Sequence, residues 1–411
     1  GNQNGLLEWG TEIDNWLQGA KYESGLDNSP MFDDARLNIK SGTMELDMAG
    51  LSGLWAADAL YLSYIAEELG DTGEAERLRT QVKEMNNRIN RELWNEELGM
   101  YCNKYWNEYS RKPKDDFFKS IPASYFKGDI TFSYSSNGDS IRKHVNHIGL
   151  AMEEVTYFSE NNIPVYWQGK LAPDKTATYF FHTSEEMGVV LEIDGTILID
   201  NRKYWITEYV SEPIHLEKDH VYDVKLTFTG DVPFELKFTP EIKTEGSLFS
   251  ERLSPTLFYP LITGAPYEDK GQQIISNLID TTLFWGNYVK PTIARNDPAF
   301  PTQGYWRGRV WPPTNYLAYL GIDDYASDSI VWQLVEKSAK MAQNEWLTQG
   351  HLHENYNAIT GTGTGTSHYC WGGLMQLMLV EEINGQKNNE FSGANPFAGK
   401  SNQLINFPLN Q

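Results

Sequence analysis

The hydrophobic period of this 411-residue chain changes twice along its length, and this change limits the folds it can adopt. Residues 1–119 and 243–384 place apolar side chains at helical spacings, whereas residues 120–242 contain short apolar runs bounded by turn signals. This order predicts a mainly α domain that carries an inserted all-β domain. Residues 385–411 are rich in Asn, Gly and Pro, which predicts a coil tail.

Two consecutive helices are predicted in the first region. Residues 45–69 carry apolar residues on one helical face, interrupted by Asp58: Leu51, Leu54, Trp55, Leu62, Ile65 and Leu69. Residues 73–93 form a second amphipathic pattern with a charged outer face, so the two segments predict an αα-hairpin. The helices predicted in the last region are 271–284, 310–320, 324–344 and 367–382.

The middle region has the pattern of a β-sandwich. Asp194-Gly195 lies between two apolar runs and is a hairpin turn signal. Residues 234–238 alternate between apolar and polar side chains, as a half-buried strand does. Further strands are predicted at 179–182, 188–200 and 221–228, and short strands at regular spacing favour a sandwich.

The net charge of −22 disfavours nucleic acid and anionic membranes as partners, because phosphate groups are bound by basic patches. No apolar run approaches the roughly 20 residues that span a bilayer, so no membrane insertion is expected. Cys102 and Cys370 form no metal or redox motif; one disulfide and two free thiols both remain open. The chain starts without an initiator Met and shows no signal peptide, which leaves export open.

Two segments far apart in the sequence offer acids for catalysis. Asp27 lies in a Gly- and Pro-containing turn, and Glu354 lies in a predicted loop at 351–357 that is followed by glycines. Glycoside hydrolysis uses two such carboxyls, one on each side of the scissile bond. The alternative is that each acid caps a helix or faces solvent, which is the more common role among the 56 acidic residues of this chain.

A third segment, residues 305–316, places Arg307 and Arg309 between Trp306 and Trp311. Guanidinium groups beside indole rings can donate to sugar hydroxyls next to a stacking face. The alternative is that these arginines pair with structural acids.

Five segments resemble, in order, motifs of the trehalases and of glycoside hydrolase family 63, which includes processing α-glucosidases and mannosylglycerate hydrolases. Residues 23–30 resemble the E-S-G-x-D signature of these enzymes. The other four are 252–261, 293–300, 305–308, and 354–357 with the later Trp371. The resemblance implies an (α/α)6 toroid with a pocket at its mouth, inversion of configuration and no cofactor or metal.

The same resemblance implies a role for individual residues. Asp27 would be the general acid and Glu354 the general base. Asp27 must then be protonated near neutral pH, through desolvation or through a nearby acid such as Glu23. The residues implied to line the sugar subsite are Trp9, Glu23, Asn28, Asp297, Trp306, Arg307, Trp311 and Trp371.

The insert resembles the protective-antigen-type β-sandwich of bacterial toxins, glycosidases and yeast adhesins, on residues 166–171, 178–181, 191–195 and 199–201. In adhesins this module binds sugar through calcium held by adjacent aspartates. Here Ser184-Glu185-Glu186 stands where Ser-Asp-Asp is common, so calcium is not expected. The module is expected either to shape the mouth of the toroid or to bind sugar.

Only 26 residues precede Asp27, and about six long helices are predicted where an (α/α)6 toroid has twelve. An incomplete toroid is expected to self-associate or to be completed by a missing N-terminal segment. The function predicted is an exo-acting, inverting α-glucosidase or α-mannosidase that acts on a short α-linked glycoside in the periplasm or outside the cell. The alternatives are a non-catalytic carbohydrate-binding protein and, with less support, a structural protein.

Overall fold

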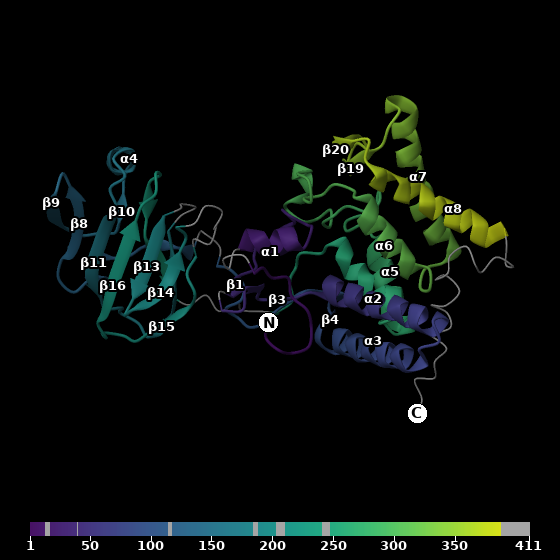
Figure 1. Cartoon of the computed structure of the whole chain (residues 1–411), viewed down its shortest axis with the longest axis horizontal. Coiled ribbons are helices and arrows are strands. Elements are labelled where there is room, and N and C mark those ends of the chain that lie inside the picture. The colour runs from purple at the N-terminus through teal and green to yellow at the C-terminus, as the bar shows by residue number, and fades with distance from the viewer. Residues whose placement is uncertain are drawn as a thin grey trace.

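The computed structural model describes residues 1–12, 17–38, 40–113, 117–183, 188–202, 210–240 and 247–387. It contains a helical region and a β module, which lie at opposite ends of Figure 1. Helices make up 38% and strands 25% of the structure. The inserted β domain is therefore confirmed, while closure of the helices into a toroid stays a prediction.

The αα-hairpin predicted in the first region is confirmed. Helices α2 (Ala49–Glu68) and α3 (Thr72–Glu92) are separated by three residues and pack against each other. Asp71 begins α3, because its side chain accepts a hydrogen bond from the Glu74 amide at 3.0 Å. The N-terminal part of the expected first helix is instead a short strand, β3 (Leu46–Asp47).

Four of the six residues in the predicted apolar stripe face outward, contrary to the usual interpretation of such a stripe, whereas Leu51 and Leu54 pack against apolar clusters. Trp55, Leu62, Ile65 and Leu69 are 36–80% exposed. Helix α2 instead packs through its small residues on the 3-10 helix η4 (Pro255–Thr263). A Cβ atom on Gly53 would lie 2.7 Å from the Pro260 nitrogen, so only glycine permits this approach.

The remaining long helices share one core with α2, α3 and η4, and α6 packs directly on η4. They are α5 (Glu268–Ile279), α6 (Pro312–Ile322), α7 (Asp328–Gln349) and α8 (Gly373–Lys387). Gly321 of α6 approaches Ile262 of η4 as closely as Gly53 approaches Pro260. Helix α8 includes the first three residues of the predicted coil tail; the rest of that tail, 388–411, lies outside the described residues.

The β module is a sandwich of two antiparallel sheets. Their strand orders are β14-β13-β16-β11-β8-β9 and β15-β12-β18-β7. The strands are β7 (Lys119–Ser120), β8 (Ile130–Ser136), β9 (Asp139–Val145), β11 (Val165–Leu171), β12 (Ala177–His182), β13 (Val189–Ile193), β14 (Thr196–Asp200), β15 (Ile214–Leu216), β16 (Tyr222–Phe228) and β18 (Lys237–Pro240). One apolar core lies between the sheets and includes Trp167 and Leu191 from one sheet and Phe181 and Phe238 from the other.

The hairpin predicted at Asp194-Gly195 is confirmed, whereas the single strand predicted at residues 234–238 is wrong. Asp194 and Gly195 both have positive φ, 46° and 77°, as the two central residues of a type I′ turn require between β13 and β14. Residues 234–238 do not form one strand. Strand β17 (Phe234–Glu235) pairs with β10 (Gly149–Leu150), whereas β18 pairs with β12 in the four-stranded sheet.

The first and last strands of the β module are neighbours. Lys119 and Ser120 of β7 pair with Phe238 and Lys237 of β18, so the chain enters and leaves the module side by side. Arg36, which is 3% exposed, joins the module to the N-terminal segment through an ion pair with Glu212 at 2.7 Å.

The other elements are short. The paired two-residue strands are β1 (Leu37–Asn38), β2 (Thr43–Met44), β4 (Trp94–Asn95), β5 (Met100–Tyr101) and β6 (Lys104–Tyr105), of which β6 pairs with β3. Helix α4 (Met152–Glu160) belongs to the β module. None of the helices within the described ranges is long and apolar enough to cross a membrane.

We expect Gly53→Ala to lower the free energy of unfolding by about 1–3 kcal/mol, because the new methyl group would overlap η4. Gly73→Ala is the matched control in α3, where the nearest atom to a new Cβ is 3.8 Å away. There the same change removes backbone entropy from the unfolded chain and should be neutral or stabilise by up to about 1 kcal/mol. Urea unfolding followed by far-ultraviolet circular dichroism measures both; equal midpoints would contradict this account of α2 packing.

Candidate active site

Asp27 lies in the turn between α1 (Leu17–Glu23) and the 3-10 helix η1 (Pro30–Phe32). Gly25 has a φ of 68°, which lets the chain reverse after α1. Gln18 of α1 donates to the Asp27 carbonyl at 3.0 Å. The Asp27 backbone is therefore tied to the helix before it.

Glu354 lies on a strand, and the prediction of a loop at this position is wrong. Strand β19 (His353–Tyr356) pairs with β20 (Gly363–Ser367). The Glu354 carboxylate is 8% exposed and accepts three hydrogen bonds. The donors are the Tyr305 hydroxyl at 3.2 Å, the Thr366 amide at 3.3 Å and the Asn355 side chain at 3.4 Å.

The two acids interact electrostatically although they are far apart in the sequence. Burial raises the pKa of Asp27 above its usual value, and the charge of Glu354 raises it further. Glu23 is exposed at the end of α1, and its charge is not among the causes of this pKa shift. The second acid that acts on Asp27 is therefore Glu354 and not Glu23.

Tyr305 interacts with both of these acids and was not selected by sequence reasoning. Burial and then the Glu354 charge raise the pKa of Tyr305 to about 12, and Asp27 contributes to the same shift. Its hydroxyl therefore remains a hydrogen-bond donor at neutral pH. Tyr305 stands within a recognised motif, but no local signal in the sequence shows that its side chain reaches a strand 49 residues later.

Asn28 uses its side-chain amide to hold the segment that contains Tyr305. Its nitrogen donates to the Gly304 carbonyl at 3.0 Å, and its oxygen accepts from the Trp306 amide at 2.9 Å. Both polar atoms of the side chain thus bind protein backbone. The predicted contact of Asn28 with sugar would have to compete with these bonds.

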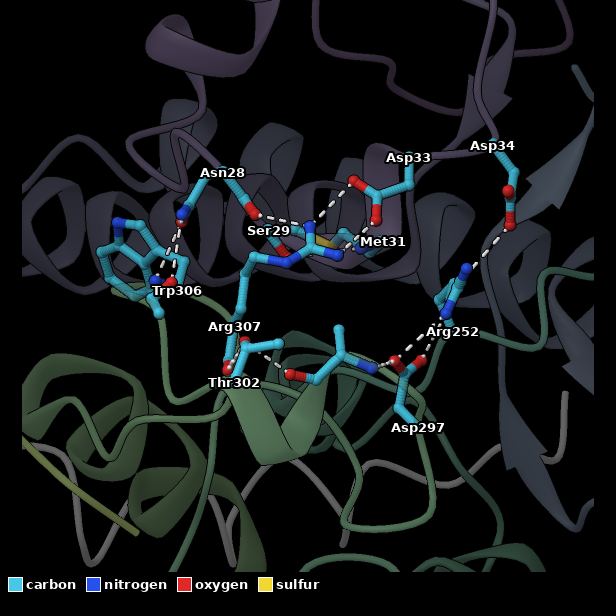
Figure 2. A network of polar contacts seen from close by, with 12 residues as sticks. Asn28, Ser29, Met31, Asp33, Asp34, Arg252, Asp297, Thr302, Trp306 and Arg307 are labelled. Carbon is cyan, nitrogen blue, oxygen red and sulfur yellow. Dashed lines mark hydrogen bonds and ion pairs between the residues drawn. The ribbon is translucent and has the colours of Figure 1, made fainter. Parts of the chain in front are cut away.

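Figure 2 shows that Arg307 and Asp297 also take part in protein contacts. Arg307 forms a bidentate ion pair with Asp33, at 3.0 and 2.7 Å, and donates to the Asn28 carbonyl at 3.2 Å. Asp297 accepts from Arg252 at 3.1 and 3.0 Å. Arg307 therefore pairs with a structural acid, which is the alternative noted above for the two arginines.

The tryptophans predicted to line the sugar subsite differ in how much of their rings is exposed to solvent. Trp306 and Trp311 are buried and stack on each other with ring centroids 3.6 Å apart. Trp371 lies 5.9 Å from Trp311 and is 36% exposed, so it is the one of these three indoles that offers a face to a ligand. Trp9 is partly buried against the apolar cluster that underlies the Asp27 turn, together with Leu26.

Among the described residues, no group of three or more His, Cys, Asp or Glu side chains is arranged to hold a metal ion. Residues 184–186, on which the calcium prediction for the β module depended, lie outside the described part of the chain. Cys102 and Cys370 are free thiols, so the alternative of a disulfide between them is wrong.

Known proteins resemble this chain over parts of its length. A mannosyl-oligosaccharide glucosidase of Saccharomyces cerevisiae is 28% identical over 125 residues, which cover 27% of this chain and 15% of the relative. The mannosylglycerate hydrolase MGH1 of Selaginella moellendorffii is 27% identical over 123 residues, 29% of this chain and 23% of the relative. The matches thus span less than a quarter of the length of either relative.

A solved structure of a GH63 mannosylglycerate hydrolase from Thermus thermophilus, in complex with glucose, matches with 22% identity. The match covers 32% of each chain, with a TM-score of 0.28.

Two family models match this chain. Residues 121–247 match the PA14 domain, which assigns the β module. The model described as the mannosylglycerate hydrolase MGH1-like glycoside hydrolase domain matches residues 16–116 and 222–372, which is more than half of the chain. The chain therefore belongs to the family of MGH1-like glycoside hydrolase domains of glycoside hydrolase family 63.

Proposed function

We propose that this protein is an inverting α-glycoside hydrolase in which Asp27 is the general acid and Glu354 the general base. The observation that carries the proposal is the electrostatic contact of these two carboxyls, because the Glu354 charge and burial together favour a protonated Asp27. A general acid must hold its proton at the working pH, so these are the conditions that such a residue needs. Family membership supports the same reaction class.

The reaction transfers two protons in one step. A water molecule attacks the anomeric carbon while Glu354 takes one of its protons, and Asp27 gives its own proton to the departing glycosidic oxygen. The bond between the anomeric carbon and that oxygen breaks, and the product sugar has the opposite anomeric configuration. Exchange of protons with solvent then restores both carboxyls to their starting states.

The substrate class is proposed from the relatives. One relative is named a mannosyl-oligosaccharide glucosidase and another a mannosylglycerate hydrolase, so we propose a short α-linked glucoside or mannoside, cleaved at its end. The exposed face of Trp371 would stack on the apolar side of a sugar ring.

We expect Asp27→Asn and Glu354→Gln each to lower kcat by about 10²- to 10⁴-fold on the glycoside that wild-type protein hydrolyses fastest, because each variant removes one proton-transfer group. A panel of α-glucosides and α-mannosides, with release of sugar as the readout, identifies that glycoside. Glu84→Gln, at an exposed carboxyl on α3, is the matched control and should keep wild-type activity. Full activity in either site variant would reject the proposed pair of catalytic residues.

An α-glycosyl fluoride separates the two roles, because fluoride leaves with little help from an acid. Asp27→Asn should lose less activity on the fluoride than on the glycoside, whereas Glu354→Gln should lose as much on both. Proton NMR of freshly released sugar should show the β anomer first. Initial release of the α anomer would show retention of configuration and would contradict the proposed mechanism.

We also expect Asp27→Asn to raise the melting temperature at neutral pH. The folded state raises the pKa of Asp27, so the ionised carboxyl destabilises the fold once the pH exceeds the unfolded value of about 4. The gap in melting temperature between variant and wild type should be small near that pH and should grow until the pH passes the folded pKa. Thermal scans across pH, with Glu84→Gln as the control, measure this gap; a gap independent of pH would contradict the desolvation of Asp27.

A further inference from the structure

Tyr305 connects the proposed base to the segment of the proposed acid. Its hydroxyl donates to Oε1 of Glu354 at 3.2 Å, and the other carboxylate oxygen, Oε2, is bound by the Thr366 amide and the Asn355 side chain. Tyr305 is thus the donor that fixes one of the two oxygens. Without it, the hydrogen bonds of this carboxylate in the described structure all lie on Oε2.

The backbone of Tyr305 is held in an unusual conformation. Its φ is 60°, in the left-handed region that non-glycine residues seldom adopt. Such conformations persist where the surrounding structure enforces them, and they gather at functional sites. The contacts that hold Tyr305 in this conformation therefore bear on what the residue does.

Two side chains enforce this conformation. Asn28 binds the residues on both sides of Tyr305, at the Gly304 carbonyl and the Trp306 amide. Trp311 donates from its indole nitrogen to the Tyr305 carbonyl at 3.1 Å, and the two rings meet edge to face with centroids 4.9 Å apart. The tyrosine ring and its backbone are therefore both fixed.

We propose that Tyr305 is a positioning residue, whose hydroxyl orients the Glu354 carboxylate toward the attacking water and whose own position is set by Asn28. The inference rests on the proposed function, because it assigns Tyr305 a task in the same reaction. Since Asn28 directly follows Asp27, one short segment carries the proposed acid and also sets the orientation of the proposed base. Asn28 and Tyr305 would then together set how the two carboxyls are oriented relative to each other.

Orientation matters because a general base must direct a lone pair at the proton it removes. A carboxylate held at both oxygens has one orientation available, whereas a carboxylate held at one oxygen can rotate away from the water. Loss of the Tyr305 hydroxyl should thus lower the rate.

The test is Tyr305→Phe, which keeps the ring against Trp311 and removes the hydroxyl. The probes are α-D-glucosyl fluoride and α-D-mannosyl fluoride, whose hydrolysis depends little on the Asp27 proton. We expect kcat to fall by about 10- to 100-fold, with KM changed by less than about twofold, because the hydroxyl acts through Glu354.

Tyr319→Phe is the matched control. It also removes a hydrogen bond between a tyrosine and a glutamate, from Tyr319 of α6 to Glu382 of α8 at 2.8 Å, away from the two proposed catalytic acids. The control should change stability without changing kcat. Equal effects of the two variants on kcat would reduce Tyr305 to a structural role and overturn the proposal.

The part of Asn28 is tested by a double-mutant cycle. If Asn28 acts through Tyr305, Asn28→Ala should lower kcat on the fluorides, and adding it to Tyr305→Phe should lower kcat by less than it does alone. Additive effects would show that Asn28 acts elsewhere and would overturn its assigned role.

Failure of this inference differs from failure of the proposed function. An inactive Glu354→Gln together with a Tyr305→Phe that keeps wild-type kcat rejects the positioning role alone. A fully active Glu354→Gln rejects the proposed function itself.

Discussion

The bidentate ion pair between Arg307 and Asp33 joins two segments that are 274 positions apart in the sequence, and the candidate site depends on this junction. The neighbouring acid, Asp34, pairs with Arg252, which also binds Asp297. Two adjacent aspartates after the Asp27 turn thus anchor both ends of the segment 297–307 (Figure 2). Each of these side chains is at least partly buried, where a paired charge is far less costly than an unpaired one.

The residues proposed for catalysis could be named from the sequence, whereas their tertiary contacts could not. Asp27 and Glu354 were selected because a pair of carboxyls and an ordered set of motifs pointed to them, and their catalytic roles stay predictions. The contacts around them were not predictable, because Asn28, Arg307 and Tyr305 each bind partners that are remote in the sequence. A local pattern reports the residue types in a motif but not the tertiary partners of their polar atoms.

In the fold too, features set by neighbouring residues were predicted correctly, whereas features set by distant contacts were not. The turn at Asp194-Gly195 was predicted correctly because two positive φ angles are a local requirement that the sequence expresses directly. The outward stripe of α2 was misread because large apolar side chains usually face a core, whereas here close approach to η4 selects glycine. Residues 234–238 alternate as one strand would, yet hydrogen-bond partners in two different sheets divide them.

The pairing of β7 with β18 has a consequence for how this architecture could arise. Adjacent strands lie about 4.8 Å apart, so the two ends of the β module are separated by a single strand spacing. A host loop can accept such a module with little change in its own path, since the incoming and outgoing chains nearly coincide. The sandwich could therefore be gained by insertion at a single loop, whereas its later loss would leave the buried Arg36 without Glu212.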